Sequence, residues 1–139
     1  MLTLVVLCGC SRFRVSGEQP DRVEGVTVDV VTVDTRVTEV MDDSVLGEAG
    51  RLLFPVEDWY WRGDTLGNLS YTWYTQLDAR TSVDVVNRLR SDATEGEQVF
   101  YDIYTDEKKR VDPAKHDTGL YFFRGDPGAH VAIVSAGGG

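Results

Sequence analysis

Three consecutive glycines, Gly137, Gly138 and Gly139, are the residues whose type and spacing most directly suggest a chemical role. They follow an apolar run at residues 131–136, which predicts a strand that is buried on both faces and ends in a glycine-rich turn. Acyl transfer places negative charge on a former carbonyl oxygen, and loss of one backbone N–H donor aimed at that oxygen costs about 3 kcal/mol. Glycine suits such a turn because it tolerates positive φ and close approach of a substrate. The pattern therefore suggests an oxyanion-binding turn.

The side chains that would complete such chemistry do not occur in these 139 residues. A serine nucleophile in the pattern G-x-S-x-G is missing. We interpret Ser135 as a structural residue of the apolar strand, His116 as a solvated loop residue and His130 as a residue beside a turn. No cluster of His, Cys, Asp and Glu has the spacing of a metal site, so we expect no metal and no cofactor.

The first ten residues are uncharged and almost entirely apolar, and they are too few to span a bilayer, which takes roughly 20 residues. Residues 7–10, Leu-Cys-Gly-Cys, resemble the lipobox of a bacterial lipoprotein, in which Cys10 would be the lipidated residue. The alternatives are a buried N-terminal strand and a misplaced start. The lipobox interpretation predicts a secreted or cell-envelope protein on the outer side of the membrane, attached through a lipid anchor and a flexible tether at residues 11–24.

The chain carries a formal net charge of −9 and has no basic stripe with interleaved aromatic residues. An acidic surface repels phosphate, so we expect no nucleic-acid partner. The hydrophobic fraction of 42% is close to that of globular proteins, which argues against a disordered chain.

Alternation of valine with threonine and aspartate predicts strand structure at residues 25–40. The spacing of Thr81 and Asp84 predicts the start of a helix over residues 81–91, and Gly96 marks its exit. Strands are expected at residues 98–104 and 119–124, with a solvated loop at 105–117 between them and a turn at 125–128. We divide the chain into a β-rich N-terminal extension with one clear helix (25–95) and a second domain (96–139).

An aromatic group lies in the predicted extension. Its members could line a substrate entrance: Trp59, Tyr60, Trp61, Trp73 and Tyr74. The alternative, which we favour, is that these side chains pack the extension onto the sheet, since buried aromatic residues mostly serve cores.

Ordered motifs from Gly50 to Gly139 resemble a group of bacterial α/β-hydrolases, many of them lipases or esterases. The motifs are Gly-Arg-Leu-Leu-Phe-Pro-Val (50–56), Gly-Asp-Thr-Leu-Gly (63–67), Trp-Tyr (73–74), Thr-Ser-Val-Asp-Val-Val-Asn (81–87), Phe-Tyr-Asp-Ile-Tyr (100–104), Thr-Gly-Leu-Tyr-Phe-Phe (118–123), Gly-Asp-Pro-Gly-Ala (125–129) and the final glycines. The resemblance implies an α/β fold, here the first three strands of a truncated hydrolase sheet.

The resemblance also implies the function of a serine-type carboxylic ester hydrolase. These residues would contribute the oxyanion-hole strand but not the nucleophile, acid or histidine, which follow that strand in the family. The 139 residues alone would then be inactive, and the substrate of the whole enzyme would be a small-molecule, glycan or lipid ester. The alternative is a complete, small, β-rich surface lipoprotein that is not catalytic and binds a partner or glycan.

Overall fold

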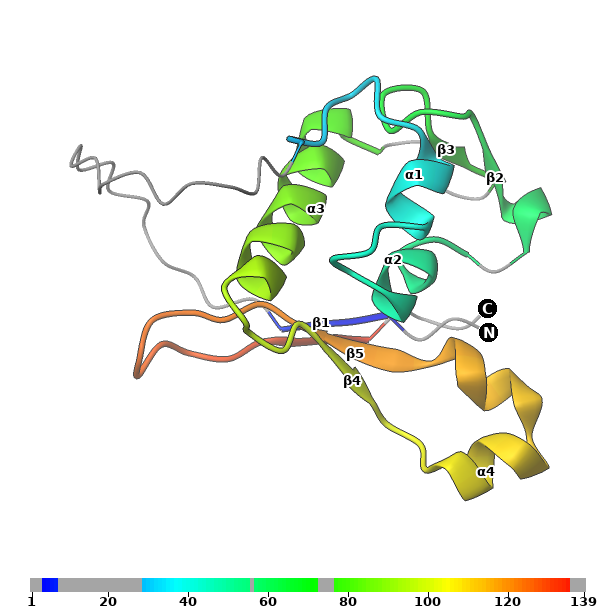
Figure 1. Cartoon of the computed structure of the whole chain (residues 1–139), viewed down its shortest axis with the longest axis vertical. Helices are drawn as coiled ribbons and strands as arrows, with labels where there is room; N and C mark the ends of the chain where they lie inside the picture. The colour runs from blue at the N-terminus through cyan, green and yellow to red at the C-terminus, as the bar shows by residue number, and fades with distance from the viewer. Residues whose placement is uncertain (1–3, 8–28, 56, 73–76, 136–139) are drawn as a thin grey trace.

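The computed structural model describes residues 4–7, 29–55, 57–72 and 77–135 (Figure 1). These residues form a mixed α and β structure in which helices cover one face of a four-stranded sheet. The helical elements are α1 (Val37–Met41), α2 (Glu48–Leu52), η1 (Asp58–Tyr60), α3 (Ala79–Thr94), α4 (Asp106–Val111) and η2 (Pro113–Asp117). The strands are β1 (Leu4–Leu7), β2 (Trp61–Arg62), β3 (Ser70–Tyr71), β4 (Phe100–Asp102), β5 (Gly119–Phe122) and β6 (Ile133–Ser135).

The main sheet has the strand order β4-β5-β1-β6. Strand β5 is antiparallel to β4 and parallel to β1, and β1 is antiparallel to β6. Strands β4 and β6 therefore run in the same direction. The chain passes from β5 to β6 without pairing them, because β1 lies between the two (Figure 1). Strands β2 and β3 form a separate two-stranded hairpin.

The hydrophobic core lies between the helices and the sheet. It includes Leu52 of α2, Val86 and Leu89 of α3, and Tyr121 of β5. The ring of Tyr121 packs edge-on against Phe100 of β4, with the ring centroids 5.0 Å apart. One cluster thus joins residues on both sides of position 95, where the sequence suggested a division.

Helix α3 shows how local chemistry sets the boundaries of an element. Asp78 is the N-cap, and its carboxylate accepts a hydrogen bond from the backbone N–H of Thr81 at 2.8 Å. The prediction that Thr81 opens the helix is therefore wrong by two residues, because the aspartate offers the stronger cap. Gly96 follows the helix with φ +86°, a left-handed conformation that favours glycine, which confirms the predicted exit.

Three other predictions are corrected by the structure. The extension is helical rather than β-rich, since residues 37–41, 48–52 and 79–94 form helices and its two strands hold two residues each. The segment 105–117 is not a loop but contains α4 and η2, with Thr105 as the N-cap of α4. The strand predicted at 131–136 is shorter and exposed: Val131 and Ile133 keep 70% and 75% of their surface accessible.

Candidate functional site

A tight loop at residues 63–69 links β2 to β3 and positions the aromatic residues next to it. The Asn68 side-chain oxygen accepts hydrogen bonds from the backbone N–H groups of Asp64 and Thr65, at 3.0 and 2.9 Å. Its amide group donates to the Asp64 carboxylate at 2.8 Å, which lowers the pKa of Asp64 below its usual range. Gly63 has φ +96°, and a Cβ there would lie 2.3 Å from the Asn68 carbonyl oxygen. This contact explains why the loop begins with glycine.

The same loop is fixed to the segment before α1. The Val37 N–H donates to the Asp64 carbonyl oxygen at 3.0 Å, and the Gly67 N–H donates to the Val33 carbonyl oxygen at 2.7 Å. Leu66 of the loop is buried in the core. The motif at 63–67 therefore has a structural task, which is to attach the β2–β3 hairpin to the body of the molecule.

Beside this hairpin, two aromatic side chains form an exposed platform. The rings of Trp59 and Tyr60 stack with centroids 3.8 Å apart and planes inclined by 25°. Trp59 keeps 47% of its surface accessible and Tyr60 keeps 36%. The Trp59 indole N–H donates a hydrogen bond to the Glu57 carboxylate. The Trp59–Tyr60 platform thus joins apolar ring surface to a carboxylate, a combination suited to a ligand with both apolar and hydroxyl groups.

The backbone under the platform is held in place by three hydrogen bonds. The Thr72 hydroxyl donates to the Trp59 carbonyl oxygen at 2.8 Å, and the Thr72 N–H donates to the Tyr60 carbonyl oxygen at 2.7 Å. The Arg62 guanidinium also donates to the Trp59 carbonyl oxygen, at 3.2 Å. The platform is therefore preorganised, which lowers the entropic cost of binding.

The structure separates the two tryptophans that the sequence grouped together. Trp61 is partly buried, packs against the core and pairs with Tyr71 across the hairpin. Burial raises the pKa of the Tyr71 hydroxyl. Trp59 instead points to solvent and is available to a ligand. Trp73 and Tyr74 lie outside the described residues.

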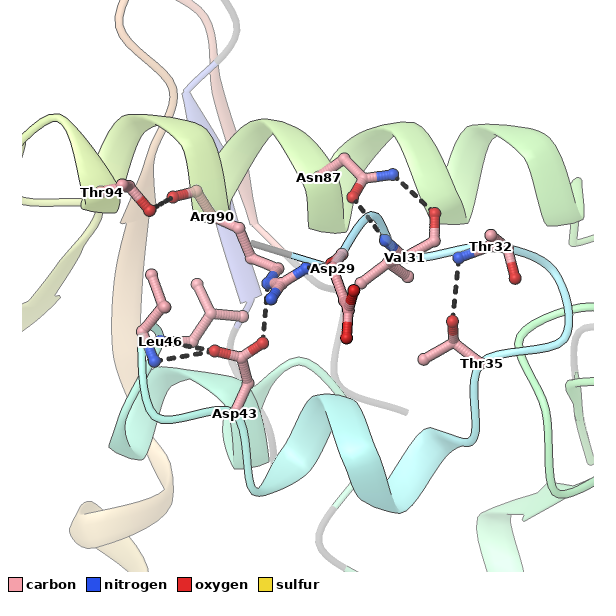
Figure 2. A network of polar contacts seen from close by, with 10 residues as sticks. Asp29, Val31, Thr32, Thr35, Asp43, Leu46, Asn87, Arg90 and Thr94 are labelled. Carbon is pink, nitrogen blue, oxygen red and sulfur yellow. Dashed lines mark hydrogen bonds and ion pairs between the residues drawn. The ribbon is translucent and has the colours of Figure 1, made fainter. Parts of the chain in front are cut away.

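A second polar region lies along α3 and holds residues 29–31 in place (Figure 2). Asn87 accepts from the Val31 N–H at 3.0 Å and donates to the Val31 carbonyl oxygen at 2.9 Å. Arg90 lies 2.7 Å from the Asp43 carboxylate in a largely buried ion pair, where charge attraction rather than a well-aligned hydrogen bond joins the two groups. A hollow of about 350 Å³ lies beside Asn87 and Arg90, but their polar groups are committed to these structural contacts.

Gly137, Gly138, Gly139 and Cys10 lie outside the described residues. Ser135 is exposed on β6 rather than enclosed, and His116 is exposed in η2. Within the part of the chain that the structure describes, no three His, Cys, Asp or Glu side chains are grouped so that they could hold a metal ion. The same residues include no helix that is long and apolar enough to cross a membrane.

Comparison of the chain with models of protein families, with curated proteins and with solved structures gives no match. The resemblance to α/β-hydrolases therefore rests on the ordered sequence motifs. Glu57 joins the candidate site from the structure, because its carboxylate accepts a hydrogen bond from the Trp59 indole N–H. Tyr60 already belonged to the aromatic group that the sequence indicated, and the run Glu57-x-Trp59-Tyr60 was the available signal for Glu57.

Proposed function

We propose that these residues form the opening part of an α/β-hydrolase that cleaves carboxylic esters, and that they supply its oxyanion-binding turn. The observation that carries the proposal is the arrangement of β4, β5 and β6. The first two are antiparallel, and β6 returns to the direction of β4 two strand positions beyond β5, with β1 between them. An α/β-hydrolase places its oxyanion turn after the third strand of its sheet, which is the role that the proposal gives to β6.

The motifs that carry the resemblance support the proposal because they coincide with these elements. Residues 100–104 contain β4, residues 118–123 contain β5, and residues 125–129 contain a turn closed by a hydrogen bond from the Ala129 N–H to the Asp126 carbonyl oxygen. In that turn Gly128 has φ +82°, which requires glycine. Strand β6 then leads toward Gly137, Gly138 and Gly139.

In the proposed enzyme, the backbone N–H groups of these three glycines stabilise the oxyanion of the acyl-transfer intermediate. The nucleophilic serine, the acid and the histidine come from outside this sequence, so these 139 residues alone do not turn over an ester. The substrate is a small-molecule, glycan or lipid ester. A lipid on Cys10 would attach the enzyme to the cell envelope.

The test uses the complete reading frame that encodes these residues. We expect that protein to hydrolyse short-chain p-nitrophenyl esters and to react with a fluorophosphonate probe. Gly138→Pro removes one N–H donor and is expected to lower kcat by 10²- to 10³-fold, on the order of one oxyanion donor. Gly138→Ala keeps the donor but adds a Cβ, so its kcat should fall clearly less than that of Gly138→Pro. A complete protein with neither ester turnover nor probe labelling would refute the proposal.

A second candidate function follows from the Trp59–Tyr60 platform. Its exposed rings and adjacent carboxylate suit a sugar, whose C–H face stacks on aromatic rings while its hydroxyl groups form hydrogen bonds. The 139-residue chain would then bind oligosaccharides without cleaving them. Affinity electrophoresis in gels that contain soluble polysaccharides tests this: migration should be retarded for the wild type and restored by Trp59→Ala. Equal migration of the two proteins in every polysaccharide would exclude this function.

A further inference from the structure

The Trp59–Tyr60 platform lies next to a carboxylate that carries no ion pair. Glu57 accepts a hydrogen bond from the Trp59 indole N–H, which holds the carboxylate at the edge of the stacked rings. None of the ion pairs between residues that the structure describes involves Glu57. The carboxylate is therefore available to a cation that approaches the rings.

The rings themselves also lack a cation from the protein. Within the described ranges of the chain, no Lys or Arg side chain lies over Trp59 or Tyr60, and the cation–π contacts involve other rings. Arg62 is the nearest cation in the sequence, but its guanidinium donates to the backbone carbonyl oxygens of Trp59 and Trp61, at 3.2 and 2.9 Å. Aromatic faces attract cations through the ring quadrupole. The accessible ring surface and the carboxylate thus favour the same kind of ligand.

The chemistry of this surface favours an alkylated ammonium group over a simple one. A primary ammonium is a compact, strongly hydrated charge. A quaternary ammonium spreads its charge over methyl groups that also cover apolar ring surface, and aromatic residues are the usual means of binding it. The formal net charge of −9 adds a general attraction for cations.

We propose that Glu57, Trp59 and Tyr60 form a binding site for a soluble small molecule that carries a quaternary ammonium group. The methyl groups pack on the accessible ring surface, and the Glu57 carboxylate compensates the positive charge. The hydrogen bonds from Thr72 to the backbone of both aromatic residues fix the site before the ligand arrives. The inference uses the platform of the second candidate function but assigns it a charged ligand. Its test measures ammonium binding, so it and the binding of neutral polysaccharides can fail separately.

The first experiment uses the full 139-residue chain and choline as the probe. Saturation-transfer NMR on the choline methyl signal should give a dissociation constant in the millimolar range, as expected for an exposed cation–π site. The uncharged analogue 3,3-dimethylbutan-1-ol has nearly the same shape and should bind at least fivefold more weakly, and ethanolamine should also bind more weakly. Undetectable binding of choline, or equal binding of the uncharged analogue, would overturn the proposal.

The second experiment compares variants whose far-UV circular dichroism matches that of the wild type. Trp59→Ala should abolish the signal. Glu57→Gln keeps the rings and should weaken binding about two- to fivefold, the range of an exposed charge pair. Glu107→Gln is the matched control, because it removes the same charge from an exposed position on α4, which lies apart from β2 and β3 (Figure 1). Equal weakening by the two glutamine variants would show a general effect of net charge and refute the site.

A third experiment tests the lipid source of the same chemical group. Sedimentation with phosphatidylcholine vesicles should leave the protein in the supernatant, because the lipid phosphate beside the ammonium is repelled by Glu57 and by the acidic surface. Cosedimentation would show that the rings enter a lipid surface and would overturn the assignment of a soluble ligand.

Discussion

The hydroxyl of Tyr121 donates a hydrogen bond to the carbonyl oxygen of Ala49 inside the core. The bond joins β5 of the main sheet to α2 of the helical layer. Burial raises the pKa of this hydroxyl well above its ordinary value, so it stays protonated and able to donate.

Replacing Tyr121 with phenylalanine should therefore destabilise the fold. The change leaves the Ala49 carbonyl oxygen buried without its partner, and the expected loss in unfolding free energy is about 1–3 kcal/mol. Urea denaturation followed by circular dichroism measures this loss. Tyr101→Phe is the matched control, because Tyr101 is a partly exposed tyrosine on the adjacent strand β4. Equal losses for the two variants would contradict a special role for the Tyr121 bond.

A methyl group at position 119 should disturb the sheet at its centre. An ideal Cβ on Gly119 would lie 1.9 Å from Cζ of Phe100, so the ring would have to move. We expect Gly119→Ala to lower the unfolding free energy by about 1–3 kcal/mol, the usual cost of overpacking. The double variant with Phe100→Leu should lose less than the sum of the single variants. Additive losses in this double-mutant cycle would show that the ring is not the obstacle.

The ion pair between Arg90 and Asp43 should tolerate joint replacement better than loss of one partner. Their side chains are only 12% and 11% exposed, and the Asp43 carboxylate also accepts from the Val45 N–H at 2.8 Å. Asp43→Ala leaves a buried guanidinium unpaired and should cost about 3–5 kcal/mol. Adding Arg90→Met should restore part of that stability. Thermal and urea unfolding of the single and double variants compare these costs, and a double variant less stable than Asp43→Ala would refute the expectation.

Stability should fall in acid partly because of Asp78. The Thr81 N–H lowers the pKa of this carboxyl in the folded state below its unfolded value of about 4. The stabilisation is therefore present above pH 4 and is lost as pH falls through the folded pKa. Asp78→Asn keeps a good N-cap but does not titrate. Its melting temperature should match the wild type near pH 7 and decline less between pH 5 and 3. Parallel curves for the two proteins would contradict this.

Patterns set by local chemistry could be predicted from the sequence. The helix exit at Gly96, the turn at Gly128 and the strand around Phe100 depend on neighbouring residues, and the structure confirms them. The valine-rich segment 29–40 was misjudged because tertiary contacts decide its form. Val37 and Val40 turn into the core from a short helix, whereas alternation alone favours a strand.

The candidate site could be predicted only in part for a related reason. Trp59 and Trp61 are two residues apart, and sequence gives both the same aromatic character. The change from η1 to β2 between them turns Trp61 toward the core and leaves Trp59 in solvent. Only the backbone path distinguishes them.

The pairing of Leu4 with Gly119 joins two residues that lie far apart in the sequence. Synthesis proceeds at about 5–20 residues per second, so on the order of ten seconds pass between the synthesis of residues 4–7 and the synthesis of β5. Contacts between such distant residues also form slowly, because loop closure must come first. During this interval residues 4–7 have no β5 to pair with, so the four-stranded sheet can close only after residues 119–122 have been made.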